Sequence, residues 1–362
     1  MRQTSQRAGR PASMADVARH AGVSPITVSR VSNGYEGVAE ETRRQVAAAM
    51  RDLGYRPNSA ARALRSGQFR TIGVITFTLS TTGNMRTVDS IATAAAHAGY
   101  AITLLPVEAP TRSGVHGALT RLHELAVDAV IVIMEVQLLD RAAVAVPPGI
   151  ATVVVDSDAG DHYVVVDTDQ ADGARQAVEH LLELGHVDIR HVAGPESSFA
   201  AHTRAAAWRA ALNARGLPAS PPIVGDWSSD SGYRAGLALA ADPWCTAIFA
   251  ANDQMALGVL RALSEAGRTV PDDVSVVGFD DVQEAADYIP PLTTVHQDFG
   301  EVGRLCVERV LHQLRYHEST PGTTLVPTSL VVRRSTGPCR TRHVPRDPGS
   351  PAPTATEHHP ED

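Results

Sequence analysis

The chain has 362 residues, of which 43 % are hydrophobic, and no apolar run approaches the length of a membrane span, so we expect a water-soluble protein with two or three folding units. It contains no lysine, which excludes the P-loop and Schiff-base mechanisms that depend on that side chain. Its three cysteines are far apart and form no CxxC pair, so neither a zinc site nor a disulfide framework is expected. The polar first residues contain no signal-peptide core, and these features together predict a cytoplasmic protein with no metal and no cofactor.

Charge is distributed unevenly along the chain. Residues 1–70 contain twelve arginines and five acidic residues, whereas the remainder contains twenty arginines and thirty-five acidic residues. The overall charge of −8 therefore combines a head of +7 with a body of −15. A basic head on an acidic body predicts that the head alone binds a polyanion such as nucleic acid.

Three short helices are predicted in the head. Apolar residues of MADVARHAG recur at helical spacing from Met14 onward, and the final glycine of this motif is a typical C-terminal cap. In SPITVSRVSNG, Ser24 is a predicted N-cap, and Pro25 occupies the first helical position, where its missing N–H costs nothing. A third helix is predicted over residues 40–53, with the poorly capping Ala39 before it.

A helix, a glycine-containing turn and a second capped helix form the helix-turn-helix pattern. In that arrangement the N-terminal part of the second helix faces the base edges in the major groove of DNA. Arg30 can bond bidentately to guanine, Ile26 can contact only an apolar surface such as a thymine methyl, and hydroxyl or amide groups suit phosphates. A helical hairpin without a role in DNA binding is the alternative, and the basic head argues against it. The candidate DNA-binding residues are Pro25, Ile26, Thr27, Ser29, Arg30 and Asn33.

From residue 71 onward, short β-branched runs alternate with helical stretches such as AVEHLLELG and QMALGVLRALSEAG. The predicted strands are TIGVITFTL, AITLLPV, AVIVIM, ATVVVD, IRHVAG, AIFAAND and VSVVGFD. This alternation predicts βαβ units and parallel sheets that are buried on both faces. The segment is large for one sheet, so an α/β core of two doubly wound lobes is expected. Residues 337–362 contain six prolines and no leucine and are predicted to form a disordered tail.

Polar residues follow several of these strands, at the edge where ligands of open α/β sheets bind. Asp156 ends ATVVVD, Asn252 precedes the last residue of AIFAAND, and Asp280 ends VSVVGFD. Trp227 comes shortly after the apolar residues IVG. Carboxylates and amides can bind adjacent hydroxyls of a sugar, and an aromatic ring can cover its C–H face. Each polar residue taken alone is better explained as a helix N-cap, but together they indicate a sugar site.

The motifs MADVARHAGVSPITVSRVSNG and AAMRDLGYRPNSAARALRSG resemble the head of the lactose/galactose repressor family of bacterial transcriptional regulators. The resemblance extends through the body to about Ser335. It implies a small all-α helix-turn-helix head and a hinge helix, joined to a two-lobed core like that of a periplasmic binding protein. It also implies that the hinge helices of two subunits pair in the minor groove, where a leucine from each opens a central base step. The hinge residues implied are Asn58, Ala61 and Leu64.

Within the core, HTRAAAWR, GDWSSDSG, ANDQMALG, VVGFDD and IPPLTTVHQDF carry the resemblance. The effector-binding residues that it implies are Asp156, Arg204, Trp227, Asn252, Asp280, Gln297 and Phe299. By this resemblance the charged residues and the asparagine bind ring hydroxyls, and the two aromatic residues form apolar walls. Phe77 replaces a small polar residue in the pocket floor, which leaves the particular galactoside open.

The resemblance also implies a domain order. The expected parts are a disordered basic tail (1–12), a helix-turn-helix domain (13–57), a hinge helix with its linker (58–69), a two-lobed core (70–336) and the C-terminal tail (337–362). Lobe 1 is expected at about 70–167 and 297–325, and lobe 2 at about 168–296 and 326–336.

The predicted function is a ligand-responsive repressor that binds a palindromic operator and is released by a sugar, for which the resemblance implies a galactoside. Residues 350–362 contain no apolar heptad, so we expect a homodimer rather than a tetramer. Corepression by another sugar or metabolite is the alternative within the family. A sugar-transport protein is disfavoured by the basic head. An enzyme is disfavoured by the lack of GxSxG, HExxH, GxGxxG and P-loop motifs.

Overall fold

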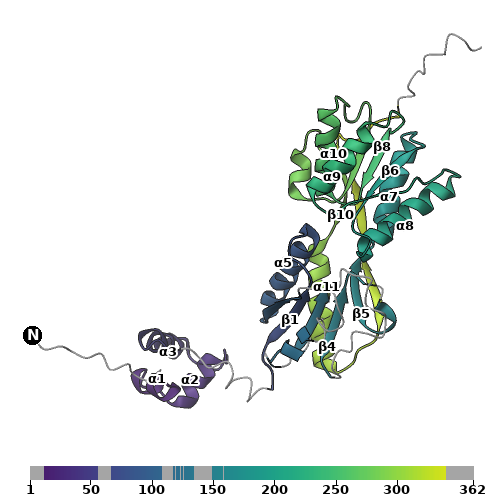
Figure 1. Ribbon diagram of the computed structural model, residues 1–362. Helices are drawn as coiled ribbons and strands as arrows, with labels where there is room; N and C mark the ends of the chain where they lie inside the picture. Colours follow the sequence, from purple (N-terminus) through teal and green to yellow (C-terminus); the bar gives the residue numbers. More distant parts are fainter. Residues whose placement is uncertain are drawn as a thin grey trace, which may run out of the picture. The chain divides into compact units, whose positions relative to one another are not determined.

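The computed structural model describes residues 12–55, 67–107, 117–118, 120–122, 124, 126–133, 149–157 and 159–339. The predicted hinge residues Asn58, Ala61 and Leu64 lie outside these ranges. The chain divides into two units, Met1–Arg70 and Thr71–Asp362 (Figure 1). Within the described ranges, no helix is long and apolar enough to cross a membrane.

The N-terminal unit contains the three predicted helices, α1 (Met14–His20), α2 (Pro25–Ser32) and α3 (Glu40–Asp52). Ser13 and Asp16 cap α1 reciprocally, and the Ser24 hydroxyl accepts a hydrogen bond from the Thr27 amide at the start of α2. Ala39 gives α3 no side-chain cap, as expected. The helices share one apolar core, whose buried members are Val17, Ala18, Val28, Val46 and Ala49.

Lobe 1 of the second unit is built on a parallel six-stranded sheet with the order β11-β5-β4-β3-β1-β2 (Figure 1). Its strands are β1 (Thr71–Thr76), β2 (Ala101–Pro106), β3 (Ala129–Ile133), β4 (Ala151–Val155), β5 (Val164–Thr168) and β11 (Gly322–Val326). The helices α5 (Thr82–His97) and α11 (Phe299–Tyr316) pack on one face of this sheet. A short 3-10 helix, η1 (Ala159–Asp161), precedes β5.

Lobe 2 is built on a second six-stranded sheet, with the order β12-β10-β9-β8-β6-β7. Its strands are β6 (Ile189–Ala193), β7 (Ile223–Val224), β8 (Ala247–Ala250), β9 (Ser275–Asp280), β10 (Thr293–Gln297) and β12 (Thr328–Val331). The helices α7 (Gln170–Glu183) and α8 (Phe199–Ala214) cover one face, and α9 (Ser229–Ala240) and α10 (Asp253–Glu265) cover the other. A 3-10 helix, η2 (Gln283–Asp287), follows β9.

The chain passes between the lobes at residues 168–170, 297–299 and 326–328. The last two crossings explain a departure from the predicted all-parallel sheets. Because β10 leads the chain out of lobe 2 and β12 leads it back, these neighbours must run antiparallel, as they do. The other strand pairs of lobe 2 are parallel.

All seven strands predicted from the sequence are present, but β5, β7, β10, β11 and β12 were not predicted. β7 is only two residues long, and each of the other four contains polar residues, which shorten its apolar run. A second correction concerns the C-terminal tail: the Gly337 carbonyl accepts a bond from Ser275, and the Cys339 amide donates to the Leu184 carbonyl at 2.8 Å. Residues 337–339 are therefore part of lobe 2 and not of a disordered tail.

Candidate effector cleft and DNA-binding helix

A cleft lies between the two lobes, at the carboxyl ends of their strands. Lobe 1 contributes residues at the carboxyl ends of β4 and β5, and lobe 2 contributes residues at the carboxyl ends of β8 and β9. All seven predicted effector-binding residues line it: Asp156, Arg204, Trp227, Asn252, Asp280, Gln297 and Phe299. The enclosed space is about 70 Å³, well below the roughly 300 Å³ at which ordinary ligand pockets begin. The lobes are therefore close together in this structure.

Four buried side chains form a closed ring on the lobe 2 side of the cleft. Arg204 Nε donates to Gln170 Oε1 at 2.8 Å, and Gln170 Nε2 donates to Gln297 Oε1 at 3.3 Å. Gln297 Nε2 in turn donates to Asp280 Oδ1 at 2.6 Å, and Arg204 Nη1 closes the ring 3.5 Å from the same oxygen. The ring positions an amide, a carboxylate and a guanidinium on one wall, where paired hydroxyls of a ligand can be bound.

Arg204 is the centre of this wall. Only 4 % of it is exposed, its guanidinium stacks on Phe279 at 3.7 Å from the ring centroid, and it also donates to the Ala251 carbonyl. A planar guanidinium can make these contacts simultaneously, whereas an ammonium cannot. Burial lowers the pKa of Arg204, and the carboxylates around it oppose that effect.

The carboxylates of the cleft are buried and largely shielded from water. Burial raises the pKa of Asp280 to about 6, although Arg204 opposes the shift. Burial likewise raises the pKa of Asp253 to about 8, and the charge of Asp280 adds to this shift. The Asp253 carboxylate accepts bonds from the Val282 amide and the Thr294 hydroxyl. Clustered, perturbed carboxylates in a cleft are typical of functional sites, because stability alone does not favour them.

Backbone strain occurs at the same residues. Asp156, Trp227 and Asp280 have φ values of 57°, 70° and 110°, which side-chain-bearing residues rarely adopt. Such conformations cluster at ligand sites, because they are kept where a side chain must point in one direction. Three of the seven predicted residues thus show a second feature that is independent of their residue type.

The aromatic wall is held by two specific contacts. The Trp227 carbonyl accepts a bond from Asn252 Nδ2 at 3.0 Å, and Asn252 also caps α10. The indole lies against Gly194, where an added Cβ would stand 2.4 Å from two of its ring carbons. Only glycine at residue 194 leaves the indole in this place.

A hydrogen bond between α10 and α5 joins the lobes across the cleft. Gln254 Nε2 of α10 donates to Thr82 Oγ1 of α5 at 2.8 Å, and Gln254 Oε1 accepts from Asn252 at 3.0 Å. A group that engages Asn252 therefore also acts on a contact between the lobes. Neither Gln254 nor Gln170 was among the predicted residues. Gln254 could have been suspected from its place in the ANDQ motif. Gln170 could not, because it is a single glutamine that follows an unpredicted strand.

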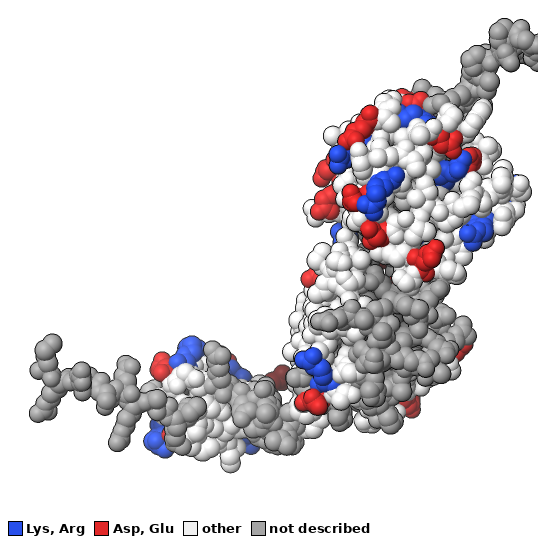
Figure 2. All heavy atoms as spheres, viewed as in Figure 1, with Lys and Arg blue, Asp and Glu red and all other residues white. Residues whose placement is uncertain are grey.

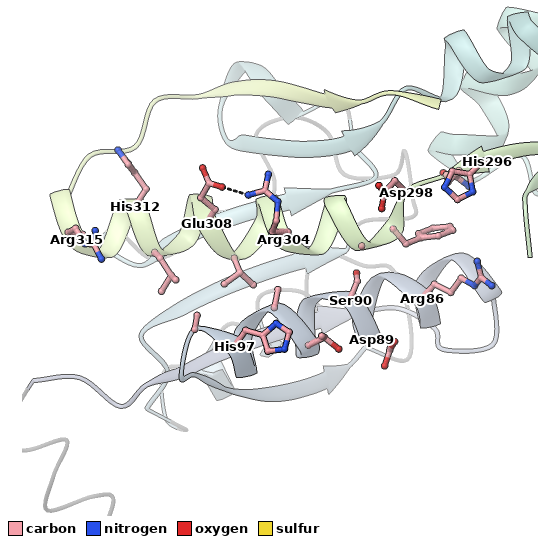
Figure 3. A pocket seen from close by; sticks show the side chains of 18 of the residues that line it. Arg86, Asp89, Ser90, His97, His296, Asp298, Arg304, Glu308, His312 and Arg315 are labelled. Carbon is pink, nitrogen blue, oxygen red and sulfur yellow. Dashed lines mark hydrogen bonds and ion pairs between the residues drawn. The ribbon is translucent and has the colours of Figure 1, made fainter. Parts of the chain in front are cut away.

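A second cavity, of about 1180 Å³, lies outside this cleft in the groove between α5 and α11 (Figure 3). Its charged side chains include Arg304, which binds Glu301 and Glu308 at 2.6 Å each. Of the predicted effector residues, Gln297 and Phe299 reach this groove as well as the cleft. We assign no function to it.

The predicted recognition helix α2 presents an exposed surface. Pro25, Ile26, Arg30 and Asn33 are exposed, and Ile26 is 66 % exposed although it is a large apolar residue. Thr27 and Ser29, the remaining predicted residues, are half-buried. The Thr27 hydroxyl contacts that of Ser24, and the Ser29 hydroxyl accepts a bond from Asn33 at 3.4 Å.

The positive charge of the head lies outside its helices. Residues 12–55 contain five arginines and five acidic residues, whereas residues 1–11 and 56–70 contain seven arginines and no acid. Acidic and basic side chains accordingly both appear on the described surface of the head (Figure 2). Non-specific attraction to DNA should therefore depend on the segments that flank the helices.

Comparison with known proteins decides the family. Residues 13–58 match the model of the lacI family of bacterial regulatory proteins, and residues 178–336 match a periplasmic binding protein-like domain. The lactose operon repressor of Escherichia coli (strain K12) is 39 % identical over 332 residues, which cover 90 % of this chain and 91 % of that protein. The chain belongs to the LacI family.

Other LacI-family proteins resemble it over similar lengths. The ribose operon repressor of Escherichia coli (strain K12) is 32 % identical and covers 84 % of this chain, with 93 % of its own length aligned. A solved structure of the lac repressor dimer bound to operator and the anti-inducer ONPF aligns with a TM-score of 0.81 and 36 % identity. That alignment covers 91 % of this chain and 100 % of the solved one.

This LacI-family chain is thus a ligand-responsive DNA-binding repressor, as predicted. Members of the family bind operator DNA and sugar effectors and act as dimers. Its relatives are transcriptional repressors and not enzymes. The predicted two-lobed fold is also confirmed, by the two sheets and by the similarity to the lac repressor.

Proposed function

We propose that this repressor is released from a palindromic operator by a galactoside that binds in the cleft between its lobes. The hydrogen-bonded ring at the cleft wall is the observation that carries the proposal. It places a carboxylate and a guanidinium 3.5 Å apart, both buried, beside an indole and a phenyl ring. The likeness to the lactose operon repressor supports a galactoside as the sugar.

In this proposal Asp156, Arg204, Asn252 and Asp280 bind the ring hydroxyls of the sugar, Gln297 holds Asp280, and two aromatic residues cover its apolar faces. Charged acceptors bind hydroxyls more strongly than neutral ones do, so the carboxylates should supply most of the affinity. Trp227 and Phe299 would contact the C–H surface.

Sugar binding would change the relation of the lobes because the closed cleft is too small for it. The cleft volume of about 70 Å³ must increase before a monosaccharide can enter. A ligand shifts such an equilibrium only by its different affinity for the two arrangements. If operator DNA favours one arrangement and the sugar another, each weakens the binding of the other.

On DNA, we propose that a homodimer places the α2 residues Pro25, Ile26, Thr27, Ser29, Arg30 and Asn33 in successive major grooves. We further propose that Asn58 starts a hinge helix, that Ala61 lies in it and that Leu64 inserts into the minor groove. In this proposal the DNA-binding head spans residues 13–57, and the hinge helix with its linker spans residues 58–69.

The test starts from DNA selected by the purified full-length protein out of a random pool of duplexes. Gel shifts with the selected duplex are then repeated with methyl β-galactoside, with ribose and without sugar. Release by the galactoside alone is expected. Stronger DNA binding with a sugar would show corepression, and an unchanged shift with every sugar would refute the galactoside.

A further inference from the structure

Asp167 is a buried carboxylate of the cleft to which no role has been given so far. It stands next to the last residue of β5, on the lobe 1 side, and is only 5 % exposed. The four other residues of β5 are three valines and a threonine, and all five are buried. A carboxylate in such a strand lowers stability unless it is compensated.

The contacts of Asp167 leave it acceptor capacity. One oxygen accepts the Thr168 amide at 2.7 Å, and the carboxylate also bonds to the Gln170 side chain. A carboxylate has about four acceptor positions, so the bonds from Thr168 and Gln170 leave Asp167 able to accept more. Gln170 joins Asp167 to the ring that contains Arg204, which places this carboxylate in the same network as Asp280.

Other polar groups on the lobe 1 wall are already engaged. The Asn84 amide donates to the Thr78 carbonyl at 3.1 Å, the Thr87 hydroxyl donates to the Gly83 carbonyl at 2.9 Å, and Thr82 accepts from Gln254. Asp167 and Asp156 are the two carboxylates that this wall offers to a ligand, and a carboxylate accepts hydrogen bonds more strongly than a hydroxyl or an amide does.

The charges of the cleft are unequal. Arg204 interacts with Asp156, Asp167, Asp253 and Asp280, so one buried guanidinium is shared by four carboxylates. Burial raises the pKa of Asp167 to about 7, and Asp169 adds to this effect, while Thr168, Gln170 and Arg204 lower it. Among the described residues of the cleft, negative charge therefore exceeds positive charge.

We propose that Asp167 is a specificity-determining residue that accepts hydrogen bonds from a hydroxyl or ammonium group of the effector and, with Asp156 and Asp280, restricts the cleft to neutral or cationic sugars. Uronic acids and sugar phosphates are excluded because their charge would face these carboxylates, and Arg204 is the only cation among the described residues that line the cleft. The inference rests on the proposed function in that it assumes a sugar in this cleft.

The test compares the full-length wild-type protein with Asp167→Asn, which keeps the shape of the side chain and removes its charge. Asp89→Asn is the control, because Asp89 is an exposed carboxylate of the same lobe in the groove between α5 and α11 (Figure 3). Calorimetry at pH 8 measures the binding of methyl β-galactoside, galactosamine and galacturonate. Thermal unfolding confirms that each variant is folded.

The wild type and the control should bind the neutral and amino sugars and exclude galacturonate. Asp167→Asn should bind methyl β-galactoside about ten- to a hundredfold more weakly. It should also lose any preference for galactosamine and show a smaller penalty for galacturonate. Wild-type affinities and selectivity in Asp167→Asn would overturn the inference.

Failure of the proposed function has a different signature. If the wild type binds its operator but none of these galactose derivatives, the galactoside is wrong, and Asp167 is tested with a wider panel. Thermal shifts of the wild type are then measured with ribose, glucose and glucosamine, and with ribose 5-phosphate and glucuronate. Stabilisation of the wild type by neutral or amino sugars supports the inference. Because this panel needs only the wild type, it also tests the inference when Asp167→Asn does not fold. Greater stabilisation by an anionic member than by its neutral parent overturns it.

Discussion

Replacing Asp280 by asparagine should abolish the response to sugar without weakening the fold. Asparagine keeps the shape of the side chain and tolerates the φ of 110° at this residue, which alanine would not. It removes the charge that would bind the sugar hydroxyls. Since a hydrogen bond to a charged group contributes about 1.5–3 kcal/mol, the loss of two such bonds should weaken galactoside binding at least a hundredfold.

The effect on stability follows from the raised pKa of Asp280. Each tenfold change in proton affinity is about 1.4 kcal/mol, so the move from 3.8 to about 6 corresponds to about 3 kcal/mol. Because the folded state binds this proton more tightly than the unfolded state, the stabilising contribution is present below pH 4 and is lost as the pH rises through 6. Asparagine resembles the protonated form. The variant should therefore match the wild type near pH 4 and be up to about 3 kcal/mol more stable at pH 8.

The adjacent Asp281 provides the matched control. It also has a positive φ, but its carboxylate binds Arg333 at 2.6 Å and His296 at 3.0 Å, and it does not line the cleft. Asp281→Asn should lose about 1–3 kcal/mol of stability, because it removes a partly buried charged hydrogen bond. Its affinity for galactoside should stay within about threefold of the wild type, since the cleft is unchanged.

Urea denaturation at pH 4 and pH 8, followed by circular dichroism, measures the stability of all three proteins, and calorimetry at pH 8 measures sugar binding. The two variants should show opposite defects: lost binding with retained stability in one, and lost stability with retained binding in the other. If Asp280→Asn is less stable than the wild type at pH 8, or still binds the galactoside normally, the assignment of Asp280 to the effector is refuted.

Three further substitutions test separate parts of the proposal. Gly194→Ala should displace the Trp227 indole, because the new Cβ would stand 2.4 Å from it; calorimetry should show at least tenfold weaker sugar binding, and gel shifts unchanged operator affinity. Arg204→Lys should break the ring, since an ammonium cannot bridge the partners of the guanidinium. Urea denaturation should show a loss of about 1–3 kcal/mol in stability, and calorimetry should show weaker sugar binding. Normal sugar binding would contradict the role of the ring. Leu64→Ala should weaken binding to the selected operator at least tenfold in gel shifts while calorimetry shows unchanged sugar affinity, and unchanged operator affinity would contradict the wedge.

Sequence patterns predicted the strong elements of this fold because those elements follow simple rules. The caps at Ser24 and the three head helices obey local hydrogen-bonding preferences. The seven predicted strands are mainly apolar, β-branched runs, and most of them are buried in the sheets of the two lobes. Of the strands that were missed, β5 and β10 carry polar residues that line the cleft, Asp167 in β5 and Gln297 in β10. The polar residues that obscured β5 and β10 in the sequence are the ones that line the site.

The site was predictable only in part. The rule that ligands bind after parallel strands placed Asp156, Asn252 and Asp280 on one edge. Resemblance to the family was needed for Arg204, Gln297 and Phe299. Arg204 lies in α8, Phe299 is the first residue of α11, and Gln297 ends β10, a strand that the sequence did not predict. Gln170 closes the ring through tertiary contacts 34 and 127 residues away along the chain. No local pattern encodes such a partner.

The location of the ring suggests how occupation of the cleft could reach DNA. Gln170 lies at the crossing between β5 and α7, and Gln297 lies at the crossing between β10 and α11, so two of its four members belong to segments that join the lobes. A sugar bound to Arg204 and Asp280 would therefore act directly on the connections about which the lobes must move. Because interactions inside a packed core have few alternative arrangements, a change of the ring should shift both crossings together. A single ligand could thus bias the whole core with no contact to the head.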